Sequence, residues 1–106
     1  MKIKEVTLDA ITFDNGSAIT FGHNQECCEW NYADFEQLDD LALNYDYDEN
    51  LIFESVENEG FRFGSHPNRM FFIPCYSEQN GFYSSDIDIY YNDVQVLTLD
   101  CEEIIS

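Results

Sequence analysis

Side chains that bind zinc are concentrated in a short segment near the start of the chain. His23, Cys27, Cys28 and Glu29 lie within seven residues of one another. Thiolate and imidazole groups suit zinc better than calcium or magnesium. Zinc prefers four tetrahedral ligands, and two adjacent cysteines usually point in different directions, so distant residues must complete the shell. The segment is therefore a candidate zinc site with an incomplete set of ligands.

The remaining thiols and imidazole in the chain are those of His66, Cys75 and Cys101, and their spacing does not choose between them. No Cys-x-x-Cys pair is present, and free cysteine is among the residue types most often buried. The segment is thus equally consistent with Cys27 or Cys28 packing as a small hydrophobic residue.

Cysteine catalysis has little support in this sequence. A nucleophilic thiol needs positive neighbours that lower its pKa, whereas here the thiols are surrounded by carboxylates. Pairs of acids that could act as general acid and base are expected by chance in so acidic a chain, and no motif selects one. We therefore expect no enzymatic activity and no catalytic residues.

The charge of the chain predicts its kind of partner. Its 106 residues include 22 Asp and Glu against four Lys and Arg, a formal net charge of -18. Self-repulsion on this scale opposes compaction, so a role for the charge is expected. Strongly basic surfaces in cells are commonly those that bind nucleic acid phosphates. The sequence predicts a basic nucleic-acid-binding protein as the partner, and no direct contact with nucleic acid or with anionic membranes.

Acids spaced two residues apart along a strand share one face and lie about 6.6 Å apart, near the spacing of phosphates on a nucleic acid strand. Asp86 and Asp88 have this spacing, as do Asp46 and Asp48 if their segment is extended. Tyrosines interleaved with these acids are candidate interface anchors or ordinary sheet packing. They are Tyr45, Tyr47, Tyr90 and Tyr91. The acids predicted to mimic phosphates are Asp34, Glu36, Asp39, Asp40, Asp46, Asp48, Asp86 and Asp88.

The composition indicates a folded chain despite its charge. Hydrophobic residues make up 44% and aromatic residues 16%, which favours one small domain over residues 1–106 and argues against disorder. No run of about 18 apolar residues occurs, and Met1 to Glu5 lacks the apolar stretch of a secretory signal. We expect a cytoplasmic protein whose cysteines stay reduced.

Two hairpins are indicated by turn residues between apolar runs. The first joins Val6–Phe13 to Ala18–Phe21 through Asn15-Gly16, which readily adopts positive φ angles. The second joins Ile87–Tyr91 to Val94–Leu99 through Asn92-Asp93, and we expect its ladder to end near Cys101.

The middle of the chain predicts one helix and further strands. Apolar residues at spacings of three and four indicate an amphipathic helix over Tyr32–Leu43, with Asn31 as its N-cap. Its apolar face would consist of Phe35, Leu38, Leu41 and Ala42. Three short strands follow, at Leu51–Val56, Phe61–Phe63 and Arg69–Tyr76, the last with an edge or bulge at Pro74. The expected fold class is α+β, a mostly antiparallel meandering sheet of about six or seven strands with one amphipathic helix.

Three segments resemble a family of phage and bacterial proteins classed as a domain of unknown function: Gln25-Glu26-Cys27-Cys28-Glu29, the aromatic and acidic stretch Trp30 to Asp40, and Asn80-Gly81-Phe82-Tyr83. The resemblance spans most of the chain. Members of that family place histidines just ahead of the Asn-Gly, where this chain has Cys75, Tyr76 and Gln79. If the family site binds metal, the resemblance implies a zinc shell of His23, Cys27, Cys28 and Cys75. The departure is equally consistent with loss of the site.

Size, acidity and this phage-like character are also similar to those of anti-CRISPR proteins. The similarity implies a phage-type anti-defence inhibitor that acts in the cytoplasm of a bacterial host. It would bind the basic groove of a CRISPR effector nuclease as a DNA mimic and block the loading of DNA or RNA. The alternative is a small zinc-binding structural or accessory protein whose acidity serves solubility.

Overall fold

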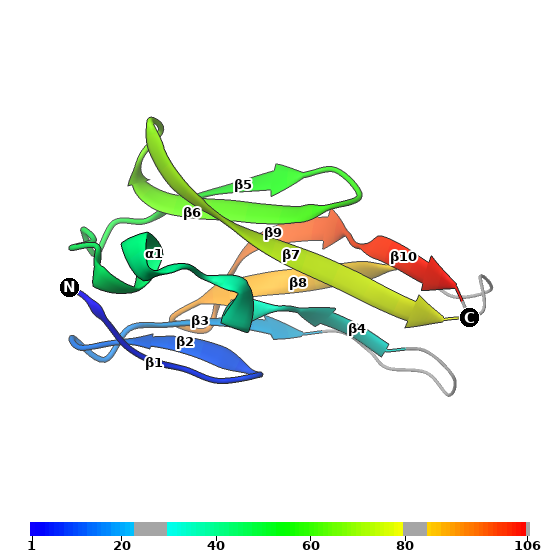
Figure 1. The fold of residues 1–106 in the computed structure, drawn as a ribbon, viewed down its shortest axis with the longest axis horizontal. Helices are drawn as coiled ribbons and strands as arrows, with labels where there is room; N and C mark the ends of the chain where they lie inside the picture. Colours follow the sequence, from blue (N-terminus) through cyan, green and yellow to red (C-terminus); the bar gives the residue numbers. More distant parts are fainter. Residues whose placement is uncertain (23–29, 80–84, 106) are drawn as a thin grey trace.

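The computed structural model describes residues 1–22, 30–79 and 85–105. In this part of the chain, ten strands form two sheets that pack face to face (Figure 1). The first sheet is antiparallel and has the order β1-β2-β3-β8-β9. Its strands are β1 (Ile3–Val6), β2 (Ala10–Phe13), β3 (Ala18–Gly22), β8 (Asp86–Tyr91) and β9 (Val94–Asp100).

The second sheet has the order β10-β7-β6-β5, and β4 also pairs with β7. Its strands are β4 (Trp30–Ala33), β5 (Ile52–Val56), β6 (Gly60–His66), β7 (Arg69–Gln79) and β10 (Glu102–Ile105). The β10–β7 pair is parallel, and the other pairs are antiparallel. β7 pairs with β6 as far as Pro74 and with β4 and β10 from Cys75 onward. Pro74, which has no N–H to donate, therefore stands where the strand changes neighbours rather than at an edge or a bulge.

Both predicted hairpins are confirmed. Gly16 has a φ of +90° in the turn between β2 and β3. Asn92 and Asp93 have φ values of 51° and 67° between β8 and β9, as a two-residue hairpin turn requires. The predicted strands of the middle region are also present as β5, β6 and β7, although β6 and β7 extend further than expected.

The expected α+β class is wrong, both in its single meandering sheet of about six or seven strands and in its one amphipathic helix, since the described residues form ten strands in two sheets. The described chain is mostly β, and residues 32–43 are divided among three elements. β4 ends at Ala33, a single 3-10 turn covers Phe35–Gln37, and α1 spans only Asp40–Asn44. Leu41, expected on the apolar face, is 70% exposed.

Two other local assignments also need correction. Asn31 is a buried residue of β4 and not a helix cap, because α1 is capped by Asp39. The run predicted as one strand from Val6 to Phe13 is broken into β1 and β2, where the Thr7 hydroxyl accepts hydrogen bonds from the N–H groups of Asp9 and Ala10. A threonine turn of this kind competes with a continuous ladder.

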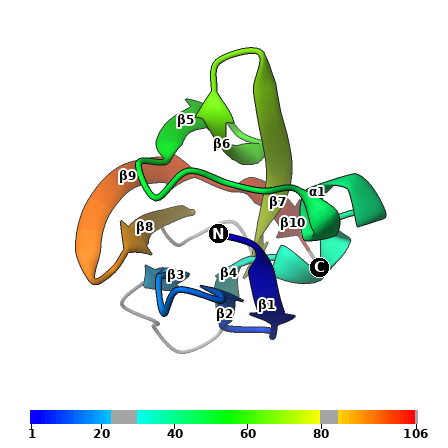
Figure 2. The same ribbon diagram turned by 90° about the vertical axis from the view of Figure 1, so that its left-hand side faces the viewer.

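The core lies between the sheets, and Figure 2 shows the first sheet curving around it from β1 to β9. Phe35 and Tyr47 extend the core from the segments outside the sheets. The other large apolar side chains that are fully buried among the described residues are those of Ile11, Phe13, Ile19, Phe61, Phe63, Ile73, Ile87 and Ile89. In the described ranges, we find no helix with the length and apolar character needed to cross a membrane.

Candidate functional site

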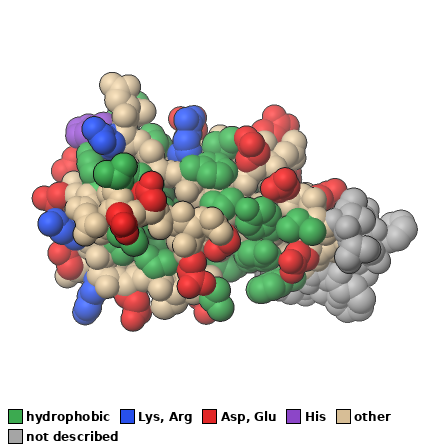
Figure 3. Space-filling view, in the orientation of Figure 1, with side chains coloured by type: hydrophobic (Ala, Val, Ile, Leu, Met, Phe, Trp, Pro, Cys, Tyr) green, Lys and Arg blue, Asp and Glu red, His purple; other side chains and the backbone are tan. Residues whose placement is uncertain are grey.

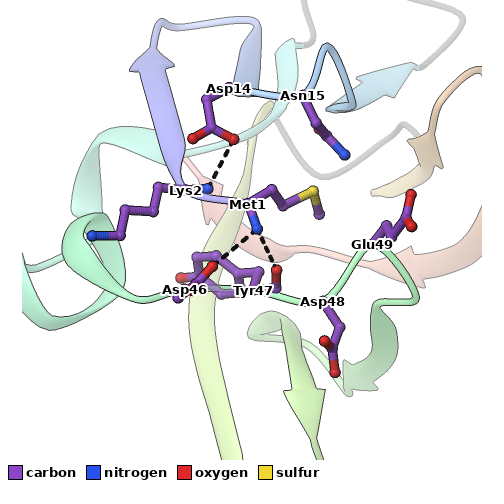
Figure 4. Close-up of a pocket in the computed structure, with 8 residues that line it drawn as sticks. All are labelled: Met1, Lys2, Asp14, Asn15, Asp46, Tyr47, Asp48 and Glu49. Carbon is purple, nitrogen blue, oxygen red and sulfur yellow. Dashed lines mark hydrogen bonds and ion pairs between the residues drawn. The ribbon is translucent and has the colours of Figure 1, made fainter.

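An open hollow is formed by the start of the chain, the β2–β3 turn and the segment between α1 and β5 (Figure 4). Four carboxylates line it, those of Asp14, Asp46, Asp48 and Glu49. Met1 and Lys2 also line it, and the Lys2 side chain extends away from Asp48 and Glu49 (Figure 4). The hollow therefore presents more negative than positive charge, and it unites acids more than thirty positions apart in the sequence.

Two of these acids are engaged by neighbouring groups. The N-terminal ammonium group of Met1 lies 3.0 Å from an Asp46 carboxylate oxygen, and its hydrogen bond and charge lower the pKa of that carboxyl. Asp14 accepts a hydrogen bond of 3.1 Å from the backbone N–H of Lys2. The carboxylates of Asp14 and Asp46 thus have structural partners within the chain.

The other two acids are fixed through their backbones. The N–H of Asp48 donates to the Ser65 hydroxyl at 2.8 Å, and the Tyr91 hydroxyl donates to the carbonyl of Glu49 at 2.7 Å. Both residues are exposed, and neither hydrogen bond uses a carboxylate oxygen. Asp48 and Glu49 can therefore offer their carboxylates to a partner without loss of these contacts.

Tyr47 holds this segment to the core. Its side chain is 2% exposed, its ring stacks on Phe63, and its hydroxyl donates to the carbonyl of Ala42 at 2.7 Å. Burial raises the pKa of the Tyr47 hydroxyl well above its ordinary value, so the hydroxyl stays a donor. Of the two roles that the sequence left open for Tyr47, interface anchor and internal packing, internal packing is the one observed.

The other predicted anchors also make internal contacts. Tyr45 is half-buried and packs edge-on against Phe71, and Tyr91 packs against Phe53. The Tyr90 ring lies beside Gly22, where an added Cβ would meet it at 3.1 Å. These contacts are those of ordinary sheet packing.

Asp86 and Asp88 share the outward face of β8, as the alternation predicts, while Ile87 and Ile89 point into the core. The Thr98 hydroxyl donates to Asp88 at 2.7 Å. Asp100 of β9 stands directly opposite Asp86. Like charges opposite one another weaken a ladder, so this acidic pair is retained at a cost in stability.

The acids predicted to line a helix lie instead on short, separate elements. Asp34 accepts a hydrogen bond from the Gln37 amide at 3.1 Å, and Glu36 is exposed on the 3-10 turn. Asp39 accepts a hydrogen bond from the N–H of Ala42 at 3.0 Å and caps α1, and Asp40 follows in its first turn. They do not form the single charged helix face that the sequence predicted.

The cap makes a testable contribution to stability. We expect Asp39→Ala to lower the free energy of unfolding by about 1 kcal/mol, because the first turn of α1 loses its side-chain acceptor. Asp40→Ala removes the same charge from the same turn and is expected to cost only about 0.3 kcal/mol. Chemical denaturation of both variants checks this, and equal losses would contradict the capping role.

Three of the predicted zinc ligands, His23, Cys27 and Cys28, lie outside the described residues. The fourth, Cys75, is fully buried beside Cys101. The hydrogen bond between the two thiols, together with burial, raises the pKa of Cys75 and disfavours the thiolate that zinc requires. His66, another candidate, is exposed at the end of β6. The described ranges contain no group of three or more His, Cys, Asp or Glu arranged to hold a metal ion, and zinc binding stays a prediction.

The sequence missed two acids of the hollow, Asp14 and Glu49, and the Asp100 partner of Asp86. Glu49 belongs to the acidic run that begins at Asp46, which was a usable signal. Asp100 faces Asp86 within the predicted second hairpin, so the sequence also carried a signal for this neighbour. Asp14 reaches residues 46–49 through the tertiary fold, for which a single sequence carries no signal.

Comparison with protein-family models, with curated proteins and with solved structures found no match in any of the three. Two of the three segments that carried the family resemblance, 25–29 and 80–83, lie outside the described residues, and the third, 30–40, matches no known family. The resemblance therefore stays an expectation.

Proposed function

We propose that this protein inhibits a nucleic-acid-binding protein by occupying its basic groove with fixed carboxylates. The observation that carries the proposal is the acidic hollow, in which Asp48 and Glu49 are exposed while their backbones are hydrogen-bonded to other elements. Because the backbones are already ordered, little backbone conformational entropy is lost when the carboxylates are bound.

The chemistry of such a partner follows from the carboxylates. An arginine that holds a phosphate by two N–H groups can hold a carboxylate in the same way. A chain with a net charge of -18 is also steered toward a cationic groove over distances longer than a hydrogen bond. A bacterial nuclease effector of the CRISPR type fits this description, and inhibition would block loading of its DNA or RNA.

The double variant Asp48→Asn, Glu49→Gln tests the hollow. The double variant Glu57→Gln, Glu59→Gln is its matched control, since it removes the same charge from the exposed β5–β6 turn. The assay measures DNA cleavage by a guide-loaded Cas9-type nuclease with increasing inhibitor, at low and high salt. Exposed ion pairs contribute about 0.2–1 kcal/mol each, so the hollow variant is expected to inhibit roughly two- to thirtyfold less well at low salt.

The control variant is expected to inhibit nearly as well as the unchanged protein, and high salt should weaken both. Equal losses in the two variants would mean that bulk charge and not the hollow is responsible. Complete indifference of the nuclease to the unchanged protein at low salt would contradict inhibition of this class of effector. It would favour the alternative in which the acidity serves solubility.

A further inference from the structure

A second exposed surface lies on the outer face of the three strands β4, β7 and β10. Residues 31, 33, 75, 77 and 79 point into the molecule and are buried, so their even-numbered neighbours point outward. Strand register places the outward residues in two rows of three. One row is Trp30, Glu78 and Ile104, and the other is Tyr32, Tyr76 and Glu102.

The aromatic rings of this outer face form a continuous series. The centroids of Trp30 and Tyr32 lie 4.5 Å apart, and those of Tyr32 and Tyr76 lie 5.7 Å apart. Trp30 is 54% exposed, although tryptophan is usually largely buried. Trp30 is also the only tryptophan in the chain. A large exposed aromatic ring of this kind is typical of an interface centre.

Carboxylates stand beside these rings. Glu78 is opposite Trp30 in the β4–β7 register, and Glu102 is opposite Tyr76 in the β7–β10 register. Burial, followed by the negative charges of Glu78 and Asp34, raises the pKa of the Tyr32 hydroxyl. Figure 3 shows the same association, with hydrophobic side chains gathered over β4 and β7 and acidic side chains at their border.

We propose that this outer face binds arginine side chains of a basic protein partner, with the guanidinium stacked on Trp30 or Tyr32 and hydrogen-bonded to Glu78. A guanidinium is planar and weakly hydrated, so it can lie flat on an aromatic ring while its edge meets a carboxylate. The ammonium group of lysine is a compact, strongly hydrated charge and cannot stack in this way. The face therefore selects arginine over lysine.

Nucleic acid bases also stack on exposed aromatic rings, but here the phosphates would meet Glu78, Glu102 and Asp34. Charge complementarity thus favours a cationic protein segment over a single-stranded nucleic acid. The proposal rests on the proposed function for the identity of the partner, a basic nucleic-acid-binding protein. It places a second contact at a surface separate from the hollow residues.

The fluorescence of Trp30 reports on this surface directly. We expect a tetra-arginine peptide to change Trp30 fluorescence and to bind roughly two- to fivefold more tightly than a tetra-lysine peptide of equal charge, the difference that stacking supplies. Glu78→Gln should weaken binding of the arginine peptide, while Glu57→Gln, an equal charge change on the β5–β6 turn, should leave it nearly unchanged.

Three results would overturn the proposal: equal affinity for the two peptides, equal weakening by the two glutamate variants, or a stronger response to an oligothymidine than to the arginine peptide. The variant Asp48→Asn, Glu49→Gln is expected to keep the Trp30 response. Because this readout is fluorescence and that of the hollow is nuclease inhibition, failure of one proposal is distinguishable from failure of the other.

Discussion

Replacing Gly60 with alanine is expected to destabilise the protein by about 2–4 kcal/mol, because the new methyl group has no space. Gly60 begins β6 with a φ of +157°, and a Cβ built there would lie 2.1 Å from the carbonyl oxygen of Ile73 and 2.9 Å from Cα of Pro74. Both contacts are backbone atoms of β7 at the point where that strand changes neighbours. Relief therefore requires separation of two paired strands and not merely a rotamer change.

Gly16→Ala is the matched control for this prediction. Gly16 also has a positive φ, +90°, but no atom lies within 4 Å of the position where its Cβ would be. Its replacement should cost only the conformational strain, about 1 kcal/mol. In a domain of this size, 1 kcal/mol shifts Tm by roughly 4–8 °C, so thermal denaturation should separate the two variants clearly. Similar Tm values for the two variants would show that the close approach of β6 to β7 does not exclude a methyl group at position 60.

The parts of the fold that the sequence predicted are those determined by adjacent residues. Asn15-Gly16 and Asn92-Asp93 favour the positive φ angles of a tight turn almost regardless of context, so both hairpins followed from local chemistry. The alternation around Ile87 and Ile89 likewise identified the outward face that carries Asp86 and Asp88. Such signals need no knowledge of the rest of the chain.

The incorrect helix shows where local reasoning fails. Phe35, Leu38 and Ala42 are indeed buried, but they reach the core from a 3-10 turn, an extended residue and a five-residue helix. The side chain of Asp39 binds the N–H of Ala42 and starts a new helix there, which separates α1 from the preceding turn. Over so short a segment, the spacing of apolar residues predicts which side chains are buried better than it predicts a helix.

The remaining features of the fold depend on contacts between distant segments, which could not be deduced from one sequence. β10 reaches β7 in parallel, the Asp14 turn reaches the segment 46–49, and Trp30 is placed opposite Glu78. In each case contacts between segments distant in the chain decide which side chains meet. The candidate surfaces are consequently built from acids the sequence identified and neighbours it did not.

Asn31 joins the two sheets through a buried polar network. It is fully buried in β4, its amide group donates to the carbonyl of Asp86 in β8 at 3.2 Å, and its amide oxygen accepts from the Ser77 hydroxyl in β7. The Gln79 amide donates to the same hydroxyl at 2.6 Å. Buried polar groups that lose a partner cost more than the bond itself contributes, because their desolvation is no longer compensated.

We therefore expect Asn31→Ala to lower the free energy of unfolding by about 2–4 kcal/mol, through lost hydrogen bonds and the cavity that the amide leaves. Asn44→Ala is the control, because Asn44 is exposed and its amide donates to the carbonyl of Asp40 within α1, and this variant should cost less than about 0.5 kcal/mol. Urea denaturation measures the free energy of unfolding of both variants, and an unchanged m-value shows that the surface exposed on unfolding is the same.

A double-mutant cycle extends this test to the network itself. Ser77→Ala alone should also destabilise, but combined with Asn31→Ala it should add less than its single effect, because the first substitution has already broken the shared hydrogen bond. Strict additivity, or an Asn31→Ala variant as stable as the Asn44→Ala control, would show that packing alone holds β4 against β8. The sheets would then not depend on the only buried asparagine among the described residues.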